Sequence, residues 1–152
     1  MLLGIDVGAV RIGVARTDPD QLLAVPLATV AFDRAASFEP GQARTDLAEL
    51  ARLAAEHQAV GVVVGLPKTL AGREGPAAQA ARHFGEALRS WLAPVPVRYV
   101  DERMTTVLAQ RNLSRSGVRA KAQRAVVDQA AAVEILQSYL ASSANQRRGD
   151  DG

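Results

Sequence analysis

The chain has 152 residues, of which 48% are hydrophobic but only 4% aromatic, and its formal net charge at pH 7 is +2. This length suits one domain with a hydrophobic core, and the absence of cysteine excludes disulfides, thiolate zinc sites and a cysteine nucleophile. No apolar run approaches the length of a membrane span, and the chain starts directly in a strand pattern, so we expect a cytoplasmic protein without a membrane partner.

The first thirty residues predict an antiparallel meander of three strands. Strands are expected over residues 2–7, 11–17 and 22–30, with tight turns at 8–10 and 18–20 between them. Pro26 lies inside the third segment, and proline cannot donate a hydrogen bond to a strand ladder. We therefore expect the third strand to lie at an edge of the sheet.

The rest of the chain predicts helices that alternate with strands. The patterns indicate a loop over 31–44, a helix from Asp46, a strand over 60–64, a helix from Pro76, a strand over 95–100, a short helix from Thr105 or Thr106 to Gly117, and a last helix over about 123–140. This order predicts an α/β fold with a mixed five-stranded sheet flanked by helices. We expect a single domain over residues 1–140 and a flexible C-terminal tail over 141–152.

Two local features of the predicted helices concern how each helix starts and which face it buries. Glu49 follows Asp46 by three residues, which is the spacing of a capping box at a helix start. The apolar face of the helix from Pro76 is expected to comprise Ala77, Ala80, Ala81, Phe84, Leu88 and either Trp91 or Leu92.

Acidic residues on three separate elements are candidate metal ligands. Asp6 ends the first strand, Asp101 and Glu102 end the fifth, and Asp128 lies on the apolar stripe of the last helix. Each acid alone has a simpler explanation, such as a salt bridge to an arginine or an exposed turn. Strand alternation sends Asp101 and Glu102 to opposite faces, so only one of them is expected in a shared site.

Together the three acids point to a centre for divalent cations. Clustered carboxylates repel one another unless cations neutralise them, and ligand sets made only of oxygen select Mg²⁺ or Mn²⁺. Two such ions about 4 Å apart would hold a scissile phosphate and activate the attacking water. The acids therefore predict catalytic, metal-dependent cleavage of a phosphodiester.

A basic segment lies between two of these acids. Residues 103–127 contain no aspartate or glutamate, and they hold Arg103, Arg111, Arg115, Arg119, Lys121 and Arg124. A solvated helical face would explain such a pattern, but the complete absence of acids favours a surface that binds the backbone of a nucleic acid.

Four ordered segments resemble the YqgF (also RuvX) family of bacterial RNase H-like proteins. The segments are GIDVGAVRIGVA (4–15), VVVGLPKTLAG (62–72), DERMTT (101–106) and QRAVVDQAAA (123–132). The family's members are called Holliday junction resolvase-like proteins or pre-16S ribosomal RNA nucleases, and the resemblance extends from Leu3 to Leu140. It implies an RNase H-like fold and phosphodiester hydrolysis that depends on a divalent metal.

The resemblance also implies roles for individual residues. Asp6 matches the metal ligand of the first strand, Asp128 that of the last helix, and Glu102, in preference to Asp101, the acid of the D-E-R motif. The residues Arg11, Lys68, Arg103 and Thr106 fall within the family motifs and are expected to contact phosphate. One departure concerns the fourth strand, where the wider superfamily carries an acid and this chain reads Gly65-Leu66-Pro67.

The expected function is processing of the 5′ end of the 16S ribosomal RNA precursor. The alternative is a Holliday junction resolvase that acts on branched DNA in recombination and repair, which would work as a symmetric homodimer because it cuts two strands. Two other classes are a nucleotide-binding domain of the actin type and a nucleic-acid-binding module without catalysis. A serine hydrolase is not expected, because His57 and His83 lie in predicted helices without a serine–aspartate context.

Overall fold

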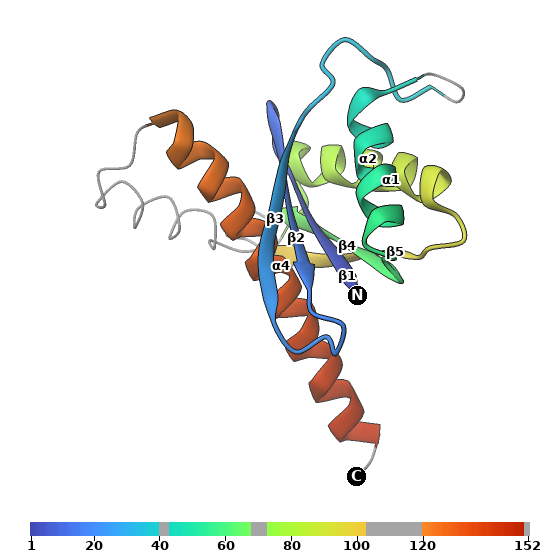
Figure 1. Cartoon of the computed structure of the whole chain (residues 1–152), viewed down its shortest axis with the longest axis vertical. Coiled ribbons are helices and arrows are strands. Elements are labelled where there is room, and N and C mark those ends of the chain that lie inside the picture. Colours follow the sequence, from blue (N-terminus) through green and yellow to red (C-terminus); the bar gives the residue numbers. More distant parts are fainter. Residues whose placement is uncertain (40–42, 68–72, 103–119, 151–152) are drawn as a thin grey trace.

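A computed structural model of the protein describes residues 1–39, 43–67, 73–102 and 120–150 (Figure 1). Five strands form one mixed sheet in the order β3-β2-β1-β4-β5. They are β1 (Leu2–Val7), β2 (Arg11–Thr17), β3 (Ala24–Ala31), β4 (Gly61–Pro67) and β5 (Val97–Glu102). Strands β1, β2 and β3 are antiparallel neighbours, whereas β4 runs parallel to both β1 and β5.

The predicted meander and its edge strand are confirmed. Strand β3 lies at the end of the sheet, and its Pro26 pairs with Ala15 beside a register shift between Val14 and Ala15. The missing N–H of proline is tolerated there because an edge strand has neighbours on one side only.

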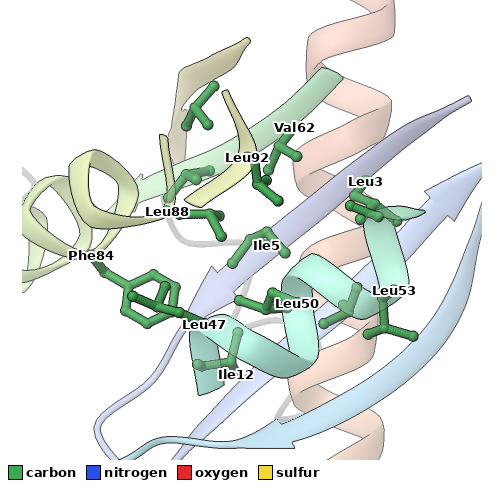
Figure 2. Close-up of a cluster of buried hydrophobic side chains, with 14 of the residues drawn as sticks. Leu3, Ile5, Ile12, Leu47, Leu50, Leu53, Val62, Phe84, Leu88 and Leu92 are labelled. Atoms are coloured by element: carbon green, nitrogen blue, oxygen red, sulfur yellow. The ribbon is translucent and has the colours of Figure 1, made fainter. Parts of the chain in front are cut away.

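Three described helices cover the two faces of the sheet (Figure 1). Helices α1 (Thr45–Glu56) and α2 (Pro76–Leu92) pack on one face and build the larger core, with Phe84, Leu50 and Ile5 at its centre (Figure 2). Helix α4 (Ala120–Asp150) crosses the other face over β2, β1 and β3, where Ala132, Ile135 and Leu136 form a smaller core. No helix among the described residues is long and apolar enough to cross a bilayer.

The start of α1 differs from the sequence prediction. The predicted capping box is wrong, because the residue before the helix is Arg44, whose side chain makes no capping hydrogen bond, and Glu49 instead pairs with Arg52. The N–H of Thr45 donates to a carboxylate oxygen of Asp33 at 3.0 Å. This hydrogen bond from Thr45 lowers the pKa of Asp33, as does a second one from the Thr45 hydroxyl.

Helix α2 buries a slightly different face from the predicted one. Its buried residues are Ala78, Ala81, Phe84, Gly85, Leu88 and Leu92. Ala77 and Ala80 are exposed, so these two assignments are wrong. Of the alternatives at the end of the helix, Leu92 is buried and Trp91 is exposed. Gly85 is among the buried residues, and an added Cβ there would lie 2.6 Å from the Tyr99 hydroxyl, so the helix approaches β5 closely at this point.

Helix α4 is longer than expected at both ends. It begins at Ala120 instead of residue 123 and continues to Asp150, well past the predicted end at residue 140. Residues 141–150 of the expected tail are therefore helical, and Figure 1 shows that the end of α4 extends beyond the sheet. The predicted short helix before Gly117 lies outside the described residues.

The loop before α1 contains a buried ion pair that the sequence pattern did not reveal. Arg44 donates from Nε and Nη2 to the two carboxylate oxygens of Asp46, at 3.0 and 2.8 Å, and both side chains are almost fully buried. The guanidinium also donates to the Ala36 carbonyl at 2.9 Å and lies 3.9 Å from the centre of the Phe38 ring. Arg44 thus fastens the loop to the start of α1.

Replacing Arg44 with methionine should destabilise the protein strongly. The change leaves the buried Asp46 carboxylate without its cation, and breaking a buried pair in this way typically costs about 3–5 kcal/mol. The free energy of unfolding from urea titration measures the effect. The control is Arg52→Gln, which removes the exposed ion pairs of Arg52 with Glu49 and Glu56 and should cost about 1 kcal/mol or less; similar losses in both variants would contradict the assignment.

Candidate functional site

Asp6 lies on the face of the sheet that helix α4 covers. An added Cβ on Gly4 would lie 2.5 Å from Leu136 Cγ and 2.8 Å from the Ala132 carbonyl, so the Gly4 position faces α4. Asp6 follows two residues later in β1, and strand alternation puts it on the same side. Its direct partner across the sheet is Gly13 of β2, and the Asp6 side chain is partly exposed.

Gly13 brings the backbone of α4 next to Asp6. An ideal Cβ on Gly13 would lie 1.9 Å from the carbonyl oxygen of Asp128 and 3.0 Å from its Cα. No side chain fits in this space, so glycine is what allows α4 to rest on β2 here. Because Gly13 also pairs with Asp6, the two predicted acids belong to adjoining parts of one surface.

Arg11 connects the start of β2 to the predicted acid of the last helix. Its Nε donates to Asp128 Oδ2 at 3.0 Å, and both side chains are partly buried. Burial raises the pKa of Asp128, and Arg11 opposes this shift by its hydrogen bond and its charge. A second polar contact holds α4 nearby, because Gln129 Nε2 donates to Thr29 Oγ1 of β3 at 2.9 Å.

The register of β5 separates the two acids at its end. Val97 belongs to the core beneath α1 and α2, and Tyr99 packs against it, so alternation puts Asp101 on that same face. The pKa of Arg82 in α2 is raised mainly by its hydrogen bond to Glu74, and Asp101 adds a smaller effect, which agrees with this placement. Position 102 pairs with Pro67 and alternates to the α4 face, where Asp6 and Asp128 lie.

Several predicted site residues lie outside the described parts of the chain. These are Lys68, Arg103, Thr106, Arg111, Arg115 and Arg119, together with the side chains of Glu102, Lys121 and Arg124. Within the parts that the structure describes, no three acidic or histidine side chains form a group that could hold a metal. The three-acid centre therefore stays a prediction, and Asp6 and Asp128 are its two described members.

The donor set on this face suits a hard divalent cation. Asp6 and Asp128 supply carboxylate oxygens, which Mg²⁺ and Mn²⁺ prefer. The close approach at Gly13 brings their two elements together, and Asp128 already holds a cationic group in the form of Arg11. Two of the three predicted ligands thus lie on adjoining elements of this face, with oxygen donors of the kind that such an ion prefers.

Sequence reasoning missed the glycines that form this surface. Gly4 and Gly13 are isolated glycines inside strand patterns, and such glycines often mark a close approach of another backbone. The sequence therefore indicated that another backbone could approach these two glycines. It did not indicate that this backbone belongs to α4, 115 residues or more away in the chain. His57 is partly exposed and His83 is exposed, with the His83 ring 4.7 Å from that of Phe38, so neither belongs to this surface.

Comparison with known proteins gives a consistent result. Residues 1–142 match the model of a family described as "RuvX: Holliday junction resolvase". Proteins named "Putative pre-16S rRNA nuclease" from Mycobacterium bovis and Mycobacterium tuberculosis are 55% identical over 98% of this chain and 85% of their own length. A third, from a Mycobacterium sp., is 54% identical over 96% of this chain and 80% of its own.

Among solved structures, the chain is similar to Thermus thermophilus RuvC in complex with a Holliday junction substrate. The TM-score is 0.52 and the sequence identity 19%, over 97% of this chain and 95% of that one. At this identity the likeness concerns the fold, and together with the mixed sheet it confirms the predicted RNase H-like architecture.

A Cβ at position 13 should disrupt the docking of α4. We expect Gly13→Ala to lower the free energy of unfolding by about 3 kcal/mol or more, because the rigid backbone of Asp128 would have to move. Urea unfolding of the full chain measures the loss.

The control for this variant is Gly61→Ala in β4. The nearest atom to that added Cβ is Leu2 Cδ2 at 2.9 Å, the end of a flexible side chain, so the cost should be near 1 kcal/mol. Equal costs at the two positions would mean that the contact at Gly13 is not specially tight.

Proposed function

Because the chain belongs to the RuvX family, we propose that it is a metal-dependent nuclease that processes the 5′ end of the 16S ribosomal RNA precursor. The names of relatives that are 55% identical over nearly the whole chain support the substrate. The structural observation that carries the proposal is the pairing of Asp6 with Gly13, against which the backbone of Asp128 rests. Such processing would take place in the cytoplasm, the compartment expected from the sequence.

We assign the ligand roles to Asp6, Asp128 and Glu102. The register of β5 supports Glu102 over Asp101, because position 102 alternates to the α4 face and position 101 to the face of α1 and α2. A divalent ion bound by these carboxylates would polarise the scissile phosphate and activate the attacking water. The protein's own part is to hold the acids on adjoining rigid elements, which the docking of α4 at Gly13 supports.

Substrate binding is assigned to the basic segment that leads into α4. Helical periodicity puts positions 121, 124 and 128 of α4 on one side of the helix, at spacings of three and four residues. Lys121 and Arg124 thus precede the proposed ligand Asp128 on the same helical face. Cations in this position would bind the phosphate backbone next to the site of cleavage.

A second candidate substrate is the Holliday junction. The description of the matching family favours it, and the same carboxylates would serve phosphodiester cleavage in DNA. A resolvase of this kind would act as a symmetric dimer, whereas processing of a precursor RNA end needs a single cut.

The test is cleavage of a labelled precursor-16S 5′ fragment and of a four-way DNA junction, with Mg²⁺ and separately with Mn²⁺. We expect cleavage of the RNA, and a loss of about 10²–10³-fold or more in the rate for Asp6→Asn and for Glu102→Gln. Binding of the fragment by the Asp6→Asn variant should persist, because asparagine keeps the shape of the side chain.

Asp101→Asn is the matched control, since it removes the neighbouring carboxylate on the other face and should cleave at the wild-type rate. If a dimer of the protein cleaved the DNA junction and not the RNA fragment, the Holliday junction would become the proposed substrate. An Asp6→Asn variant that cleaves as fast as wild type would contradict the site itself.

A further inference from the structure

An arginine of the edge strand β5 is held by a tyrosine of the last helix. The side chain of Arg98 is exposed, and its Nη1 donates to the hydroxyl oxygen of Tyr139 in α4 at 3.0 Å. The ring of Tyr139 is partly buried and packs against the smaller core between α4 and the sheet. The hydroxyl that holds this guanidinium is therefore itself fixed in position.

Arg98 differs from other arginines of the protein in the edge of the guanidinium that it leaves available. Arg44, Arg52 and Arg82 each donate from Nε and Nη2 to the two oxygens of one carboxylate. In the part of the chain that the structure describes, no carboxylate pairs with Arg98, and its Nε and Nη2 donate no hydrogen bond. This edge matches two oxygens of a phosphate as well as those of a carboxylate.

Arg98 lies on the same face of the sheet as the candidate site. Positions 98, 100 and 102 of β5 alternate to one side of the strand, and Val100 packs against the smaller core beneath α4. Arg98 precedes Glu102, the acid that we assign to the site, by four residues, or about 13 Å of extended strand.

The helix gives a second measure of the same separation. Asp128 and Tyr139 belong to one stripe of α4, with the buried Ala132 and Ile135 between them. About three helical turns, or roughly 16 Å, lie between the two positions. Strand and helix thus both put the contact of Arg98 with Tyr139 a few nucleotides of a nucleic-acid strand away from the site of cleavage.

We propose that Arg98, oriented by Tyr139, binds a backbone phosphate of the nucleic acid at a distance from the bond that is cleaved. The inference rests on the proposed nuclease function and adds a contact outside both the acidic site and the basic segment that leads into α4. Tyr139 is a positioning residue, because its hydroxyl holds Nη1 and leaves Nε and Nη2 to the phosphate. Such a contact fixes the strand on the protein without reading its sequence.

The experiment measures binding of a fluorescent precursor-16S 5′ fragment to the full chain by anisotropy, in EDTA and over a series of salt concentrations. We expect Arg98→Gln to weaken binding about five- to tenfold at low salt. The slope of log K against log salt should become shallower by about 0.7, the share of one phosphate contact with a single strand.

Arg52→Gln is the matched control for net charge. It makes the same charge change on α1, on the other face of the sheet, where Arg52 is already paired with Glu49 and Glu56. This variant should keep both the affinity and the salt slope of wild type. An equal loss in Arg52→Gln would overturn the inference, because the effect of Arg98→Gln would then reflect net charge only.

Two further variants separate binding of phosphate from a purely structural contact. Arg98→Lys keeps the charge without the planar fork, so it should recover the salt slope and part of the affinity. Tyr139→Phe should weaken binding about two- to threefold in the wild-type background and have no further effect beside Arg98→Gln. A lysine variant with the shallow slope of Arg98→Gln, or additive effects of the two substitutions, would contradict the proposed roles.

Shortened RNA fragments test where the contact lies. When nucleotides are removed stepwise from either end and the cleavage position is kept, the difference between wild type and Arg98→Gln should vanish in one of the two series. A difference that persists in the shortest fragments of both series would refute a remote contact.

The outcomes also distinguish this inference from the proposed function. If wild type cleaves the RNA, and Arg98→Gln binds it as tightly and with the same salt slope, the inference fails and the proposed function stands. If Arg98→Gln weakens binding as expected but wild type cleaves neither the RNA nor the DNA junction with Mg²⁺ or Mn²⁺, the inference stands and the proposed function fails.

Discussion

The close contact of helix α4 with the sheet is the constraint on which the candidate site depends. Gly4 and Gly13 leave the space in which the α4 backbone lies, and at Gly13 even one added carbon would collide with the Asp128 carbonyl. Because Gly13 is also the partner of Asp6 across the sheet, this contact unites the first strand and the last helix. Two acids far apart in the chain thus become parts of one rigid surface.

The two faces of the sheet each carry an arginine–aspartate ion pair, and the two pairs differ in their exposure to solvent. On the side of α1, Arg44 and Asp46 form a shielded pair that fixes a loop and has no access to ligands. On the side of α4, Arg11 and Asp128 form a partly exposed pair. The same two residue types therefore form a shielded pair on one face and a solvent-accessible pair on the other.

Most of the sheet could be predicted from the sequence because its signals are local. Apolar runs and tight turns indicate the strands, and Pro26 indicates the edge. The features that sequence analysis missed depend on contacts between distant segments: Asp33 caps α1 from the preceding loop, and Gly85 of α2 lies close to the ring of Tyr99. The pairing of Arg11 with Asp128 is likewise invisible to periodicity, although both residues were identified separately.

The most direct test of the metal centre is a crystal structure of the wild-type protein grown with Mn²⁺, with anomalous data that locate the ion. Our account predicts a manganese peak bound by both Asp6 and Asp128, at about 2.1 Å from the carboxylate oxygens as for octahedral ions of this size. A peak elsewhere, or no ion on Asp6 at saturating Mn²⁺, would contradict the account.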